Sequence, residues 1–157
     1  MNRARRNSTL IAQRPQPGTI ASGWLLLYAA WGIALVATLG ALFIGEVMGQ
    51  APCVLCWYQR AFMFPLAVIL AIACFRSDGS VWHYALPMAV LGGLVASFHT
   101  LQYLELIPQA LEPCGAGPSC TGANMTILGT IPIPILSLGA FGAIGALLIL
   151  LRKRLAT

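Results

Sequence analysis

Two cysteines and one arginine stand close together in the segment "CVLCWYQR", where Cys53 and Cys56 are separated by two residues and Arg60 follows. A thiolate is the reactive form of cysteine, and the thiol pKa falls at a helix N-terminus and near a cation. Arg60 lies four residues after Cys56 and seven after Cys53, so we expect all three side chains on one helical face. The pattern predicts a redox-active dithiol, with a structural disulfide or half of a zinc site as the alternative.

A second cysteine pair, Cys114 and Cys120, encloses the short segment "GAGPS". Bridged cysteines need Cα atoms about 4.4–6.8 Å apart, and Gly115, Gly117 and Pro118 favour a turn that allows this. The spacing therefore allows these two cysteines to bridge. Such a bridge is either a structural staple or an exposed target for an attacking thiolate.

The composition places these residues in a membrane protein. Of the 157 residues, 59% are hydrophobic and only 8% are charged, whereas soluble domains carry about 25% charged residues. The basic residues form no stripe interleaved with aromatic residues, so we expect no nucleic-acid partner. The sequence predicts one all-α domain over residues 1–157 that is embedded in a lipid bilayer.

Four segments are long and apolar enough to cross a bilayer, which takes about 20 helical residues. They lie at about 22–45, 56–75, 81–101 and 131–151. The second segment reaches this length only if its helix begins near Cys56, which puts the dithiol at a helix start and Arg60 one turn inside. In the last segment, Gly139, Gly142 and Gly145 predict close packing on a neighbouring helix.

The basic residues predict the orientation of the four helices. Eight of the nine lie in the N-terminal tail, in the short connection near Arg76 and in the C-terminal tail. Basic residues are enriched on the cytoplasmic side, so both termini are expected there, an N-in/C-in arrangement. The two remaining loops, at about 46–55 and 102–130, then face the exterior, which is the periplasm in a Gram-negative cell, and each carries a cysteine pair.

Two further side chains near the outer face have an open interpretation. Arg60 is the one basic residue off the cytoplasmic side; it either snorkels to the interface or holds a thiolate or an anionic cofactor oxygen. His99, near the outer end of the third segment, is either a packing residue or a hydrogen-bond donor to a quinone carbonyl.

The segments "CVLCWYQR" and "SFHTLQYLELIP", the second around His99, resemble those of the disulfide bond formation protein B (DsbB) family of bacterial inner-membrane oxidoreductases. The resemblance covers roughly residues 24–151. It implies a four-helix transmembrane bundle that oxidises a periplasmic thioredoxin-fold dithiol oxidase similar to DsbA. It also implies that the electrons pass to a membrane quinone, either ubiquinone or menaquinone.

The resemblance also implies an order of thiol exchange. Reduced DsbA would attack a Cys114–Cys120 disulfide, with Cys114 carrying the mixed disulfide. Cys120 would then exchange with Cys53 of a redox-active Cys53–Cys56 disulfide. Cys56, released as a thiolate, would transfer the electrons to the quinone.

By the same resemblance, Arg60 stabilises the Cys56 thiolate and the reduced quinone, and His99 lines the same pocket; no metal site is expected. One feature departs from the family. Better-known members separate the second pair by a longer segment, whereas Cys114 and Cys120 are almost adjacent here. The departure leaves open the order of exchange and whether DsbA or a more specialised dithiol protein is the partner.

Three rival functions remain open from the sequence. The first is a membrane protein with two structural disulfides and no enzymatic activity. The second is a carrier that moves electrons outward, which needs two thiols accessible from the cytoplasm, where Cys74 is the single candidate. The third is a zinc site built from the four thiolates of both pairs.

Overall fold

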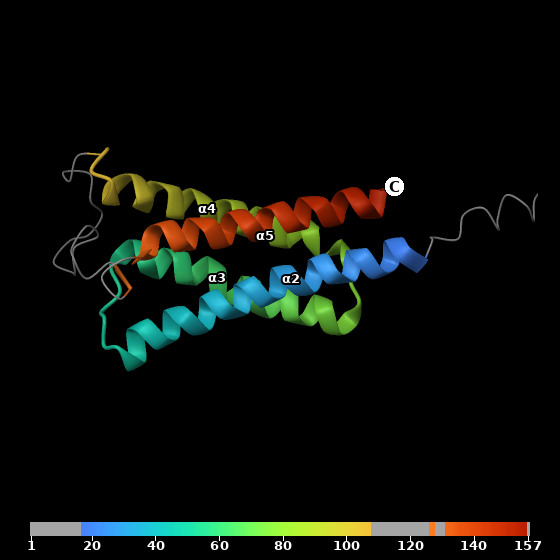
Figure 1. Cartoon of the computed structure of the whole chain (residues 1–157), viewed down its shortest axis with the longest axis horizontal. Helices are drawn as coiled ribbons and strands as arrows, with labels where there is room; N and C mark the ends of the chain where they lie inside the picture. The colour runs from blue at the N-terminus through green and yellow to red at the C-terminus, as the bar shows by residue number, and fades with distance from the viewer. Residues whose placement is uncertain (1–16, 108–125, 128–130, 157) are drawn as a thin grey trace, which may run out of the picture.

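The computed structural model describes residues 17–107, 126–127 and 131–156, and four long helices dominate it (Figure 1). These are α2 (Pro17–Leu42), α3 (Val54–Arg76), α4 (Trp82–Tyr103) and α5 (Ile133–Ala156). A short antiparallel pair, β1 (Thr126–Ile127) and β2 (Ile131–Pro132), precedes α5. The described part of the chain therefore has four candidate membrane-spanning helices, and the prediction of an all-α multi-pass membrane protein is confirmed.

The helix ends differ from the expected ones by a few residues. The first span continues beyond α2 through a π-helix, η1 (Phe43–Val47), and α4 is preceded by a 3₁₀ turn, η2 (Gly79–Val81). α3 begins at Val54, two residues before the expected start, because Cys53 caps its first turn. α5 begins later than expected because Ile131 and Pro132 pair with β1.

The helices form a ring in which each packs against two neighbours, in the order α2, α3, α4, α5 and back to α2. The largest buried side chains of the core come from three of them: Leu27, Leu66, Leu70, Phe141, Ile144 and Leu148. Large apolar side chains also cover the outside, and Phe75 is 85% exposed. A surface of this kind is stable in lipid rather than in water.

One tight contact between α4 and α5 involves a glycine of α4. A Cβ atom on Gly92 would lie 2.3 Å from Cε1 of Phe141, so the α5 ring packs directly on the α4 backbone. The expectation that Gly139, Gly142 and Gly145 make the close contact is wrong, because a Cβ atom at any of them meets nothing within 4 Å. Small residues permit close packing, but the sequence does not tell which helix presents its small face to a partner.

We expect Gly92→Ala to lower the thermal stability of the protein in detergent. The added methyl group has no space beside Phe141, and overpacking a tight core costs about 1–3 kcal/mol. Gly142→Ala is the matched control, since its Cβ atom enters open space and alanine favours a helix. An equal melting temperature for the two variants would contradict the tight α4–α5 contact.

The two ends of the bundle differ in their charges. One end holds the start of α2, the turn between α3 and α4, and the end of α5, so both termini of the described helices lie there (Figure 1). At this end the Arg152 guanidinium lies 4.7 Å from the centroid of the Trp82 ring. Of the basic residues in described segments, Arg60 alone belongs to the other end.

Candidate functional site

The connection from α2 to α3 brings the first cysteine pair to the start of a membrane helix. After the π-helix, Gly49 adopts a left-handed conformation with φ of 67°, which a glycine reaches without strain. The chain then runs to Cys53, which is extended, with φ of −69° and ψ of 169°. π-Helical turns are common at functional sites, and here the turn lies beside the cysteine pair.

Cys53 is the N-cap of α3, and its Sγ accepts a hydrogen bond from the Cys56 backbone N–H at 3.3 Å. The two sulfurs are 3.0 Å apart, both cysteines are free thiols, and Cys53 is 0% exposed. The hydrogen bond between the two thiols lowers the pKa of Cys53, burial opposes this effect, and His99 lowers the pKa further. The pair therefore has the helix-capping geometry that favours a thiolate at Cys53.

A chain of polar side chains connects Cys53 to two other helices. The Nε2 atom of His99 in α4 lies 3.9 Å from Cys53 Sγ, and Nδ1 of the same ring lies 3.1 Å from Gln59 Nε2. The Ser137 hydroxyl of α5 donates to Gln59 Oε1 at 2.9 Å. His99 and Gln59 are both buried.

Sequence reasoning missed Gln59 and Ser137. Both are polar residues inside apolar helical segments, where an unpaired polar side chain is costly. This pattern could have indicated that each has a hydrogen-bond partner.

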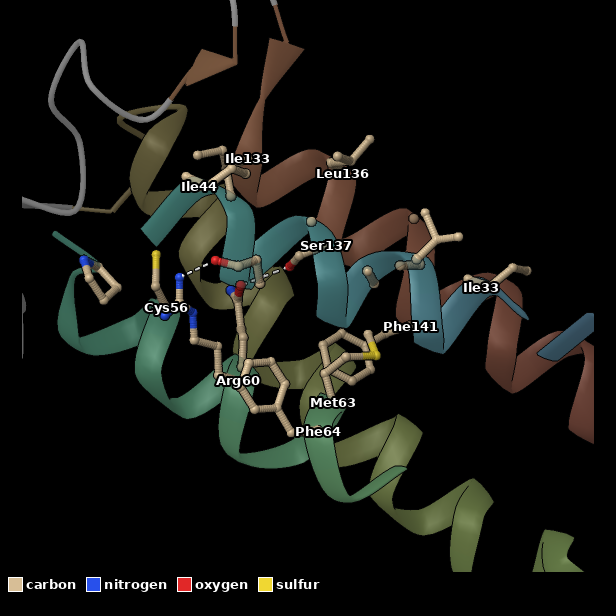
Figure 2. Close-up of a pocket in the computed structure, with 18 of the residues that line it drawn as sticks. Ile33, Ile44, Cys56, Arg60, Met63, Phe64, Ile133, Leu136, Ser137 and Phe141 are labelled. Atoms are coloured by element: carbon tan, nitrogen blue, oxygen red, sulfur yellow. Dashed lines mark hydrogen bonds between the residues drawn. The ribbon is translucent and has the colours of Figure 1, made fainter. Parts of the chain in front are cut away.

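A large apolar pocket lies between α2, α3 and α5, with a volume of about 1410 Å³ (Figure 2). Its walls are mostly aliphatic and aromatic, from residues such as Ile33, Phe64 and Leu136. The polar groups gather toward the α3 start, where Cys56, Gln59, Arg60 and Ser137 contribute to the lining. An apolar cavity with a few convergent polar groups is the usual form of a small-molecule site.

Three contacts hold Arg60 at the edge of this pocket. Its Nη2 atom donates to the Ala41 carbonyl oxygen of α2 at 2.6 Å, and its guanidinium lies 5.6 Å from the centroid of the Trp57 ring. The Gly45 backbone packs against it, because a Cβ atom there would lie 2.9 Å from Nη2. A guanidinium has five N–H donors, so the contact with Ala41 leaves donors for a ligand in the pocket.

Cys53 and Arg60 do not share a helical face, and His99 does not line the pocket, in contrast to the prediction from the sequence. Cys53 packs with α4 residues such as Phe98, whereas Arg60 reaches toward α2. The shared helical face was expected from helical spacing, which does not hold for Cys53 because that residue precedes the helix. His99 is not among the residues that line the pocket. Gln59 lines the pocket and bonds to His99.

The second cysteine pair, Cys114 and Cys120, lies outside the described residues. Its predicted disulfide and its predicted role in thiol exchange stay predictions.

Among the described residues, one group has the spacing to hold a metal ion: Cys53, Cys56 and His99, whose ligand atoms lie within 4.8 Å of one another. The Gln59 amide nitrogen donates to Nδ1 of His99, which leaves the ring proton on Nε2, the atom that faces the cysteines. A protonated ring nitrogen cannot coordinate a metal. We therefore assign no metal site here.

Cys74 is buried in the hydrophobic core near the end of α3, at the opposite end of the bundle from Cys53. No other described cysteine lies on its side of the protein. We expect Cys74→Ala to retain nearly full turnover in a steady-state assay of thiol oxidation. A loss of turnover with an unchanged melting temperature would contradict this and favour a carrier that moves electrons across the membrane.

Membrane-length helices that hold a free cysteine pair beside a large apolar pocket define a multi-pass membrane protein with thiol redox chemistry. The chain belongs to the DsbB family of disulfide bond formation proteins, whose family model, "Disulfide bond formation protein DsbB", matches residues 22–151. Membership implies oxidoreductase activity in disulfide formation and confirms the family resemblance seen in the sequence.

Curated relatives carry corresponding names. A "Probable disulfide formation protein" of Metapseudomonas resinovorans is 62% identical over 141 residues, which cover 89% of this chain and 96% of the relative. "Disulfide bond formation protein C" of Bacillus subtilis (strain 168) is 43% identical over 119 residues, covering 74% and 85%. A "Probable disulfide formation protein" of Deinococcus radiodurans is 43% identical over 137 residues, covering 82% and 89%. No solved structure gives a significant match.

Proposed function

We propose that the protein is a dithiol:quinone oxidoreductase, which oxidises a periplasmic thioredoxin-fold partner similar to DsbA and passes the electrons to a membrane quinone. The observation that carries this proposal is the different surroundings of the two sulfurs. Cys56 lines the apolar pocket, whereas Cys53 is buried beside His99 of α4. Thiol exchange and electron transfer can therefore take place at different sulfurs of one pair.

The pocket suits a quinone, which is a planar polar head on an apolar tail. A quinone, when bound, accepts two electrons and two protons and so reoxidises a dithiol. The aliphatic walls would hold the tail, and Arg60 would donate to a head-group oxygen beside Cys56. Ubiquinone and menaquinone both meet this description.

The proposed exchange moves two electrons from the partner dithiol to the Cys53–Cys56 pair through successive disulfide exchanges. A partner thiolate attacks Cys114, which forms the mixed disulfide and releases Cys120 as a thiolate. Cys120 attacks Cys53 and releases Cys56. The partner's second thiolate then frees Cys114, and Cys114 attacks Cys120, which re-forms that disulfide and releases Cys53. The chain is left with a reduced Cys53–Cys56 pair, whose electrons leave through Cys56.

The distribution of basic residues supports an orientation with both termini in the cytoplasm. Arg76, Arg152, Lys153 and Arg154 belong to one end of the bundle, and Arg60 to the other. By the rule that basic residues are enriched on the cytoplasmic side, the Cys53 end faces the periplasm of a bacterial inner membrane. A thiol-specific reagent that does not cross membranes would modify a cysteine introduced after Leu104 but not one introduced at Thr157.

A purely structural disulfide is the weaker alternative. It would need no polar surroundings, yet Cys53 has a buried histidine beside it, and Cys56 opens into a cavity. Structural bridges also resist exchange with partner thiols.

Anaerobic mixing of the purified protein with a reduced DsbA-like protein and a soluble quinone analogue tests the proposed function. We expect quinol to form in a one-to-one ratio with partner disulfide. Partner oxidation without quinol, or no oxidation by a folded protein, would reject the proposal.

A further inference from the structure

A buried hydrogen-bonded chain crosses three helices and ends at Cys53. It starts at Ser137 of α5, passes through Gln59 of α3 and His99 of α4, and has heavy-atom distances of 2.9, 3.1 and 3.9 Å up to Cys53 Sγ. Gln59 is 6% exposed, and both His99 and Cys53 are 0% exposed. The two contacts of His99 are therefore shielded from water, whereas the Ser137–Gln59 bond at the pocket wall is only partly buried. The four side chains set each other's orientation.

The direction of each bond follows from the amide of Gln59. Its Oε1 atom accepts from the Ser137 hydroxyl, so the amide nitrogen faces His99. An amide NH₂ group only donates, so Nδ1 of His99 accepts and carries no proton. The neutral ring then carries its proton on Nε2, which faces Cys53 Sγ.

We propose that Gln59 and Ser137 are positioning residues that hold His99 in the tautomer whose Nε2–H faces Cys53, so that the imidazole stabilises the Cys53 thiolate. Figure 2 shows Ser137 at the pocket wall, where its hydroxyl donates to Gln59 Oε1. The histidine then acts on Cys53 rather than on the ligand of the pocket.

The proposed role of the contact between His99 and Cys53 rests on the proposed thiol exchange. When Cys114 attacks Cys120, the bond between the Cys120 and Cys53 sulfurs breaks, a Cys114–Cys120 bond forms, and Cys53 takes the electron pair. A hydrogen bond to the departing sulfur stabilises that negative charge. No electron enters or leaves the protein in this step.

Other groups around Cys53 do not replace His99. The described titratable groups packed against it are Cys56 from α3 and Tyr103 and His99 from α4. Arg60 bonds to α2 instead. The Cys56 thiol is the larger cause of the lowered pKa of Cys53, and His99 the second favourable side chain. Loss of the orientation of His99 should therefore lower the Cys53 thiolate population but not abolish it.

The test is a pH titration of the Cys53 thiolate, followed by its ultraviolet absorbance in the full chain. The background carries Cys56→Ser, Cys74→Ala, Cys114→Ala and Cys120→Ala, so that one cysteine remains with a hydroxyl donor beside it. We expect Gln59→Leu and Ser137→Ala to raise the titration midpoint by about 0.5–1 unit, which is about three- to tenfold less thiolate below the midpoint.

Two matched variants separate positioning from stability. Ser137→Thr keeps the hydroxyl and should keep the midpoint. Ser97→Ala removes a hydroxyl that donates to the Gly93 carbonyl oxygen of its own helix and should also keep the midpoint. An unchanged midpoint in folded Ser137→Ala would overturn the proposal. A lowered midpoint would also overturn it, because Nε2 would then be the unprotonated atom. The titration involves no quinone, so its failure is distinct from failure of the proposed function.

Discussion

Cys56→Ser is expected to abolish quinol formation, lowering its rate by at least about a thousandfold, as removal of an essential nucleophile does. A serine hydroxyl neither forms a disulfide nor carries electrons, and Cys56 is the sulfur that lines the pocket. Capture of the reduced partner should persist, because the proposed first attack takes place at Cys114. The measurements are quinone absorbance under anaerobic turnover and trapping of the mixed disulfide on a non-reducing gel.

Cys74→Ala is the matched cysteine removal for this experiment, since Cys74 is buried far from the pocket and lines none of it. Quinol formation at the normal rate in Cys56→Ser would reject Cys56 as the sulfur that delivers electrons. Failure of partner capture in a folded Cys56→Ser variant would instead contradict the proposed division of work between the two pairs.

Arg60→Lys is expected to raise the KM for the quinone by at least about tenfold, which corresponds to the loss of one charge-assisted hydrogen bond. A planar guanidinium can donate to the Ala41 carbonyl and to a ligand oxygen together, whereas the ammonium of lysine is a compact point charge. The KM for the protein dithiol should change much less. Steady-state turnover with each substrate varied in turn gives both constants.

Gly45→Ala tests the same contact without changing a charge. Its Cβ atom would lie 2.9 Å from Arg60 Nη2, so the guanidinium must move, and we expect a smaller rise in the quinone KM. Gly142→Ala, whose Cβ atom enters open space, is the control. If Arg60→Lys leaves the quinone KM unchanged, or raises both constants equally, Arg60 merely snorkels to the interface.

The four membrane-length helices were predictable because the composition and length of each segment determine whether it can span a bilayer. Each span is apolar over a window long enough for a bilayer, and this signal depends on local sequence alone. The length of the second span also predicted that the cysteine pair lies at a helix start, within two residues of the observed Val54. The segments "CVLCWYQR" and "SFHTLQYLELIP" carried a resemblance to the family, which the comparison confirms.

The arrangement of the site was not predictable from spacing. Helical periodicity holds within a helix, but Cys53 precedes α3 as its N-cap, so its side chain turns toward α4 while Arg60 turns toward α2. The partners of Gln59 are 40 and 78 residues away in the sequence, and only the packing of the three helices brings them together. The same limit explains why Gly92, rather than a glycine of α5, makes the close contact.

If the proposed exchange takes place at Cys53, the complete burial of that sulfur would make the protein selective about which thiols react with it. Disulfide exchange requires the attacking thiolate to approach the target sulfur along the line of the bond, so a shielded sulfur reacts slowly with any thiol that diffuses freely in solution. A small reductant such as glutathione would therefore be excluded, whereas a cysteine tethered to the same chain gains a high local concentration. In the proposed function, burial would thus act as insulation: electrons would reach the acceptor through the proposed thiols and not from other reductants.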